Sequence, residues 1–324
     1  MLPLQRSVGS FLILGLLLNA AHAMAATPQS LDDLQDLADE PSRAELFELV
    51  KAAEIAEVPD VKKEAQKWFN LYGPFKFPND AQFDVKENKD RVDSIFGVDI
   101  SHHTDSSFPL EELYFKQVKY VYLKASQGTG YKDGKFASYW SRLDKVPVAQ
   151  RVHRGAYHFL SADKDGKEQA QTFLRVLAAN GGLKKTDMPP VLDLEWDKAS
   201  ANGPDRWTGI APARILANTK AWLEEVEKQT GRKPMLYTAR SWWRERMGSE
   251  ATFRELKDYP VWIADYSQSS RAFEVPKTPA NSKWSMWQFT DAAGMQAGYS
   301  KGFDANLFKG SEAQFYQTFD LDRF

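Results

Sequence analysis

The stretch Pro190-Val-Leu-Asp-Leu-Glu195 has the pattern of a short buried strand that ends in two acids. Other short apolar segments of strand character occupy residues 96–100, 120–125, 155–159, 235–238, 261–264 and 285–289. Between them, residues 167–179 and 211–230 predict amphipathic helices, each followed by the glycine typical of a helix end. This alternation predicts an α/β fold, either a parallel barrel or a doubly wound sheet. No glycine-rich phosphate loop follows the first strand, which disfavours a nucleotide-binding fold.

Carboxylates gather where the predicted strands end. Asp99 ends the first strand, Asp193 and Glu195 end the segment quoted above, and Asp304 follows an aromatic residue within residues 302–308. In a parallel barrel the chemistry belongs at the C-terminal ends of the strands. We therefore expect these four acids to lie together.

Asp193 and Glu195 are two residues apart, so on one strand they point to the same face, with backbones about 6–7 Å apart. Burial and like charge raise the pKa of one member of such a pair, which leaves one proton donor and one anion. Hydrolysis of a glycosidic bond needs that combination. The alternative is an acid pair that caps a helix or binds a lysine. The spacing alone does not choose between retention and inversion at the sugar carbon.

Polar and aromatic residues accompany the acids on the predicted strands. They are Tyr157, His158, Tyr237, Trp262 and Gln288. Sugar sites combine flat apolar faces with a few precisely placed polar groups. Each aromatic residue alone is more often part of a core, but their coincidence with the acids predicts a sugar-binding cleft.

Composition excludes several classes of function. The chain has 324 residues and no cysteine, which rules out thiol catalysis, cysteine-ligated zinc and iron–sulfur clusters. With 42 basic and 44 acidic side chains, it lacks the basic excess typical of nucleic-acid binding. The five histidines show no zinc-ligand spacing, so we expect neither a metal nor another cofactor.

The first 23 residues predict a secretory signal peptide. One arginine, Arg6, precedes an apolar run at residues 11–18 and a small-x-small site that ends at Ala23, with Ala26 as the alternative cleavage site. The run is too short for a membrane anchor. The protein is therefore expected to be exported, to the periplasm or beyond the cell.

Residues 24–93 predict a separate acidic unit. They contain 9 basic and 16 acidic residues, whereas residues 94–324 contain 32 and 28. Helical periodicity at residues 44–56 and 60–72 predicts a two-helix hairpin, and residues 79–93 read as a linker. We expect this extension to pack, to dock or to recruit a protein partner. The barrel domain would then occupy residues 94–324.

Eight ordered motifs lie between residues 96 and 308. They are Phe-Gly-Val-Asp99-Ile-Ser-His, Tyr-Leu-Lys124-Ala-Ser-Gln-Gly, Arg-Gly-Ala-Tyr157-His158-Phe, Leu-Asp193-Leu-Glu195, Leu-Tyr237-Thr, Trp262-Ile-Ala-Asp-Tyr, Trp-Gln288-Phe-Thr and Asp304-Ala-Asn-Leu-Phe. Together, in this order, they resemble glycoside hydrolase family 25, the Chalaropsis-type lysozymes. The N-terminal extension lies outside this resemblance.

The resemblance implies an irregular (β/α) TIM-like barrel and an N-acetylmuramidase that acts on peptidoglycan. It implies that Glu195 is the proton donor, that Asp193 orients or stabilises the acetamido group or the intermediate, and that Asp99 and Asp304 complete the acidic floor. It also favours retention, with the substrate's acetamide as nucleophile. The expected substrate contacts are Lys124, Tyr157, His158, Tyr237, Trp262 and Gln288. One departure is Gln127, where the family often has Glu, and it affects substrate contacts more than activity.

Two alternatives remain open from the sequence. A catalytically silent module would keep the cleft for binding peptidoglycan, and a chitinase-like hydrolase would also use neighbouring acids that end in Glu. In each case we expect a monomer that binds glycan strands, without nucleic acid or a membrane anchor.

Overall fold

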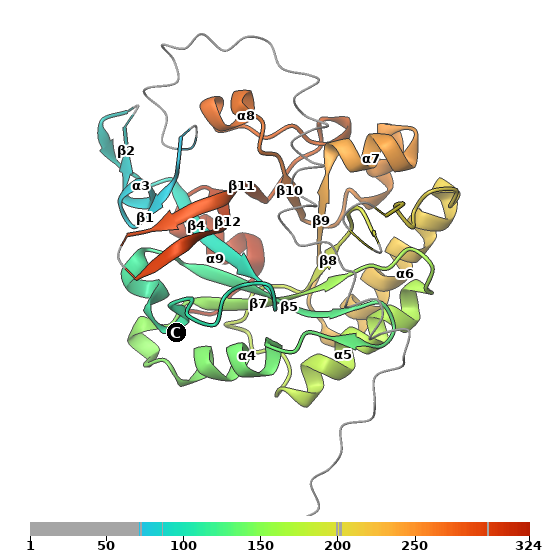
Figure 1. Ribbon diagram of the computed structural model, residues 1–324, viewed down its shortest axis with the longest axis horizontal. Coiled ribbons are helices and arrows are strands. Elements are labelled where there is room, and N and C mark those ends of the chain that lie inside the picture. The colour runs from blue at the N-terminus through green and yellow to red at the C-terminus, as the bar shows by residue number, and fades with distance from the viewer. Residues whose placement is uncertain (1–70, 72, 86, 199, 201–202, 297) are drawn as a thin grey trace, which may run out of the picture.

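The computed structural model describes residues 71, 73–85, 87–198, 200, 203–296 and 298–324 (Figure 1). The predicted signal peptide and the predicted helical hairpin lie outside these residues, except for Leu71. No helix in the described part of the chain is long and apolar enough to cross a membrane.

Eight strands close into a barrel, which confirms the predicted barrel and excludes the doubly wound sheet. In order around the barrel they are β4 (Ser94–Ile100), β5 (Tyr120–Gln127), β7 (His153–Phe159), β8 (Val191–Asp193), β9 (Met235–Ala239), β10 (Val261–Ala264), β11 (Met286–Met295) and β12 (Tyr299–Lys309). The first seven run parallel, and β12 is antiparallel to both β11 and β4.

The antiparallel strand β12 was not foreseen from the sequence. Asp304 was expected at the end of a strand, but it lies within β12. It reaches the C-terminal end of the parallel strands because the antiparallel register pairs it with Asp99, near the end of β4. The irregularity of the barrel is therefore located at its closing hairpin.

Helices cover the outside of most of the parallel strands (Figure 1). They are η2 (Leu110–Lys116), α4 (Phe136–Lys145), η3 (Val148–Gln150), α5 (Gly166–Ala179), α6 (Pro212–Thr230), α7 (Arg240–Met247), η4 (Glu250–Leu256), α8 (Gln268–Phe273), η5 (Pro279–Asn281) and α9 (Glu312–Phe319). The predicted helices at 167–179 and 211–230 are confirmed as α5 and α6. Asp165 caps α5 by accepting from two backbone amides, and Gly231 ends α6 in a left-handed conformation at φ 64°.

The segment before β4 covers the part of the barrel that lacks a crossover helix. It contains β1 (Lys76–Phe77), α3 (Asn79–Gln82), β2 (Phe83–Asp84) and β3 (Lys89–Asp90), and β1 extends the sheet beside β11. Phe75 is fully buried, and its ring centroid lies 5.0 Å from those of Phe77, Phe96 and Phe289. Residues 79–93, expected as a linker, thus belong to a segment that packs on the barrel.

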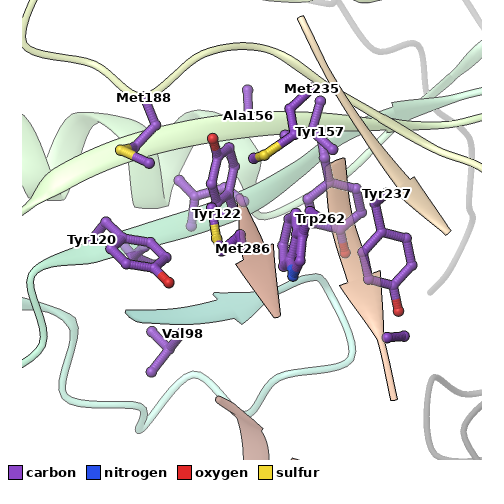
Figure 2. Close-up of a cluster of buried hydrophobic side chains, with 14 of the residues drawn as sticks. Val98, Tyr120, Tyr122, Ala156, Tyr157, Met188, Met235, Tyr237, Trp262 and Met286 are labelled. Atoms are coloured by element: carbon purple, nitrogen blue, oxygen red, sulfur yellow. The ribbon is translucent and has the colours of Figure 1, made fainter. Parts of the chain in front are cut away.

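Glycines make room for large side chains inside the barrel. A Cβ atom at Gly97 would lie 2.1 Å from the ring of Tyr120, and one at Gly155 would lie 2.2 Å from the ring of Tyr122. Small residues on one strand thus accept aromatic residues from the next. Figure 2 shows these tyrosines in a row with Trp262 and Tyr237.

Candidate active site

The strand register places most of the predicted site residues on the inner face of the barrel. Residues paired across neighbouring strands share a face of the sheet. The pairs are Asp99 with Asp304, Gln288 with Asn306, Lys124 with Tyr157, Asp193 with Tyr237, and Tyr237 with Trp262. All of these side chains are buried.

The carboxylate of Asp99 is held by two side-chain amides that follow it by 189 and 207 residues in the chain. Its Oδ2 accepts hydrogen bonds from Gln288 Nε2 at 2.7 Å and from Asn306 Nδ2 at 2.9 Å. Gln288 is itself oriented, because its Oε1 accepts from the hydroxyl of Tyr237 at 2.8 Å and from that of Tyr266. Two amide donors on one oxygen fix the orientation of the buried Asp99 carboxyl group.

Trp262 orients one of the two amides that bind Asp99. Its indole donates to Asn306 Oδ1 at 2.9 Å, which orients the amide that binds Asp99. Figure 2 shows Trp262 between Tyr122 and Tyr237, with ring centroids 5.0 Å away on both sides. Only 2% of Trp262 is exposed, and its indole N–H is bound to Asn306.

Asp193 is the last residue of β8, and Glu195 lies just beyond the strand. The predicted strand at 190–195 is therefore shorter, although the backbone amide of Leu194 still donates to the carbonyl of Tyr237 at 2.9 Å. The carbonyl of Glu195 accepts from the indole of Trp207 at 2.8 Å. Both carboxylates are 1% exposed and lie at the C-terminal end of the parallel strands, as predicted.

Lys124 joins the site through Gln127. Its ammonium donates to Gln127 Oε1 at 2.6 Å and lies 5.0 Å from the ring centroid of Phe159 and 5.7 Å from that of Tyr131. Because residue 127 is Gln, where the family often has Glu, the buried ammonium of Lys124 is bound to a neutral amide.

His158 does not lie with the other residues, contrary to the expectation. Its ring stacks on Trp222 of α6 at 5.8 Å and bonds to Ser126 Oγ at 2.8 Å and Gln169 Oε1 at 3.3 Å. Its neighbour Tyr157 faces inward, and successive residues of a strand point to opposite faces. Burial lowers the pKa of His158 to about 3, so the ring is neutral and belongs to the packing between barrel and helices.

Sequence reasoning missed Asn306, Tyr266 and Trp207 as parts of the site. Asn306 had a readable signal, because it is two residues from Asp304 and therefore shares its face on a strand. Tyr266 and Trp207 lie in loops, and no periodicity points to their contacts.

The part of the chain that carries these acids matches a known protein family. Residues 98–297, which include Asp99, Asp193 and Glu195, match the family model described as "Glycosyl hydrolases family 25". The chain belongs to glycosyl hydrolases family 25. It is therefore a glycoside hydrolase, as the paired acids at the barrel end predict.

Relatives in family 25 agree with this assignment. An N,O-diacetylmuramidase of Arthroderma benhamiae is 29% identical over 230 residues, which cover 69% of this chain and 86% of the relative. Lysozyme M1 of Streptomyces globisporus is 29% identical over 223 residues, which cover 67% of this chain and 69% of that lysozyme. The structure of a family 25 lysozyme from Aspergillus fumigatus has a TM-score of 0.56 at 29% identity, with 70% of this chain and 99% of that chain covered.

Proposed function

We propose that this family 25 protein is an N-acetylmuramidase that hydrolyses the β-1,4 bond between N-acetylmuramic acid and N-acetylglucosamine in peptidoglycan. The observation that carries the proposal is the position of Asp193 and Glu195 at the C-terminal edge of β8, on the same barrel end as the register pair of Asp99 and Asp304. The names of the relatives, a diacetylmuramidase and a lysozyme, support the choice of substrate.

Glu195 acts as the general acid in this proposal. Its proton passes to the glycosidic oxygen as the bond to the sugar carbon breaks. Asp193 orients the substrate's acetamido group, whose oxygen attacks that carbon and forms a cyclic intermediate. Water then opens the intermediate with net retention, and Glu195 takes the proton of that water. Membership of family 25 favours this retaining scheme, in which the substrate's own acetamide is the nucleophile.

Asp99 and Asp304 complete the acidic floor of the site. The two amides on Asp99 Oδ2 fix its direction, so it offers an oriented acceptor to sugar hydroxyl or amide groups. Lys124, Tyr157 and Tyr237 lie on the same inner face and supply the further contacts with the substrate.

Export is part of the proposal, because peptidoglycan lies outside the cytoplasmic membrane. Cleavage after Ala23 would release a chain that begins at Met24. N-terminal sequencing of the protein recovered from the periplasm or the medium tests this. An N-terminus at Met1 would contradict it.

Digestion of purified peptidoglycan followed by mass spectrometry of the new reducing ends tests the activity. We expect muramic acid at these ends with the wild type. Glu195→Gln should lower kcat by about 10²–10⁴-fold, the usual contribution of general acid catalysis. Ends that carry N-acetylglucosamine, or full activity in Glu195→Gln, would refute the proposal.

The same assay separates the two alternatives. Chitin oligomers are offered beside peptidoglycan under one set of conditions, and preferential cleavage of chitin would indicate a chitinase-like enzyme. Saturable binding of peptidoglycan without new reducing ends would indicate a silent module.

A further inference from the structure

A buried network of charges and indoles lies directly behind Glu195, in the loop between β8 and α6. Its centre is Asp197, two residues after Glu195 and only 1% exposed. Asp197 Oδ2 accepts from the backbone amide of Ala162, in the loop after β7, at 2.7 Å. Its Oδ1 binds Arg206 Nη1 at 2.9 Å. One carboxylate therefore ties the chain after Glu195 to the loop after β7 and to the return segment of its own loop.

Residues 205–207, where the loop returns toward α6, bind both the backbone amide and the backbone carbonyl of Asp197. The amide of Arg206 donates to the carbonyl of Asp197 at 2.6 Å, and the amide of Asp197 donates to Asp205 Oδ1 at 2.9 Å. The next residue, Trp207, donates its indole N–H to the carbonyl of Glu195 at 2.8 Å. A shift of Arg206 would therefore move its neighbour Trp207, which is hydrogen-bonded to the backbone of Glu195.

Helix α7 anchors the outer side of the same network. Arg246 Nε lies 2.6 Å from Asp205 Oδ2, and the guanidinium also contacts Glu245. Glu245 Oε2 accepts from the indole of Trp196, the residue between Glu195 and Asp197, at 2.9 Å. The backbone that carries Glu195 is thus held from α7 as well as from the loop.

We propose that Asp197 is a positioning residue for catalysis: its ionised carboxylate, paired with Arg206 and bound to Ala162, holds the backbone of Glu195 where the proton is donated. This rests on the proposed role of Glu195 as general acid. Asp197 does not touch the reacting atoms, and it acts through the Arg206–Trp207 segment.

The charge state of Asp197 changes near pH 6. Burial raises its pKa to about 6, Asp205 adds to that rise, and Arg206 opposes it. Arg246 faces Asp205 and not Asp197. Protonation removes the ion pair with Arg206, so the network holds Glu195 less firmly below pH 6.

The remaining element against Asp197, the loop after β7, brings no charged side chain to it. Its contact is the amide of Ala162, while Asp163 and Lys164 pair with each other at 3.4 Å with more than a third of each side chain exposed. Arg206 and Asp205 are therefore the charged side chains that influence the pKa of Asp197.

Steady-state kinetics of Asp197→Asn between pH 4 and pH 8 test the proposal. Asparagine resembles the protonated acid, since it has one acceptor oxygen and no charge. Above pH 7 we expect kcat to fall about 10–100-fold with KM within a factor of about 3, as for misplacement of a catalytic group by about 1 Å. The ratio of wild-type to variant kcat should decline toward 1 as the pH falls below 6.

Asp187→Asn is the matched control. Asp187 is also buried, pairs with Arg154 Nε at 2.9 Å and accepts from the amide of Lys184 at 2.7 Å, but it precedes β8 at the other end of the barrel. We expect its kcat to follow that of the wild type at every pH. Thermal unfolding of both variants checks that they are folded.

A ratio that is constant with pH, or an unchanged kcat in Asp197→Asn, would overturn the positioning role even if the wild type cleaves peptidoglycan and Glu195→Gln does not. A wild type that produces no muramic acid ends would refute the proposed function, and the role of Asp197 would fall with it. Arg206→Met adds a second measure. If the pair acts as a unit, the double variant should be no slower than Asp197→Asn alone.

Discussion

Asp99 and Asp304 are register partners in the antiparallel strands β4 and β12, although 205 positions separate them in the chain. Two carboxylates side by side in a buried site repel each other unless donors surround them. Gln288 and Asn306 supply donors to Asp99 from the two strands of the closing hairpin. The hairpin that closes the barrel therefore also orients the carboxyl group of Asp99.

Gln288→Glu should damage the site with almost no change in shape. The substitution replaces the amide that donates to Asp99 with an acceptor, and a second negative charge opposes the first. We expect kcat/KM at pH 7 to fall at least ~10-fold, as for loss of a transition-state hydrogen bond of more than about 1.4 kcal/mol. Gln169→Glu is the control, because Gln169 is equally buried but binds Ser161 outside the site. Equal losses in both variants would contradict the specific role.

Asp197→Asn should lose activity without losing stability at neutral pH. The pKa of Asp197 is raised from 3.8 to about 6 in the folded state, so its stabilising contribution is complete below pH 3.8 and is lost as the pH rises through 6. The free energy of unfolding of the variant, relative to the wild type, should therefore rise by roughly 2 kcal/mol from pH 4 to pH 7. Urea unfolding at several pH values measures it. A relative stability that falls over this range would contradict the assigned cost of burying the charge.

His158→Gln should make the protein less sensitive to acid. Burial lowers the pKa of His158 from 6.5 to about 3, so its stabilising contribution is present above pH 6.5 and is lost as the pH falls toward 3. Between pH 6.5 and pH 5 the wild type should lose about 2 kcal/mol more than the variant. Urea unfolding at these two pH values measures the difference. Identical acid slopes would show that His158 does not carry this effect.

Phe75→Ala should destabilise the barrel even though Phe75 precedes its first strand. The ring is fully buried against Phe77, Phe96 and Phe289, and truncation of a buried Phe costs about 3–5 kcal/mol. Phe273→Ala, at a residue 63% exposed, should cost less than about 0.5 kcal/mol. Chemical unfolding compares the two. A cost below 1 kcal/mol for Phe75→Ala would contradict the covering role of this segment.

This covering role also affects how the N-terminal extension is tested. A deletion of residues 27–90 would remove Phe75 and Phe77 together with the predicted hairpin, and so it would damage the barrel itself. A deletion that ends at residue 70 leaves the covering segment in place. It tests the predicted docking or partner role of the extension alone.

Much of the fold was readable because local patterns determine it. All seven predicted strands are present, since apolar runs this short and bounded by turn residues fit a buried strand better than a helix. Helices α5 and α6 were found by their period and their glycine ends. Strand β12 was missed, because its exposed residues 300–302 interrupt the apolar pattern and its partners lie on both sides of the closure.

The sequence by itself determined the alternation of strands and helices, the candidate acids of the site and the order in which they occur, because strand periodicity and residue chemistry are local properties. The tertiary structure alone decided which residues meet. Closure of the barrel pairs Asp304 with Asp99, directs Gln288 and Asn306 onto the same oxygen and turns His158 toward the helices. It also brings Arg206 to Asp197 behind Glu195. These contacts depend on register and on the return of a long loop, neither of which is encoded in any single stretch of the chain.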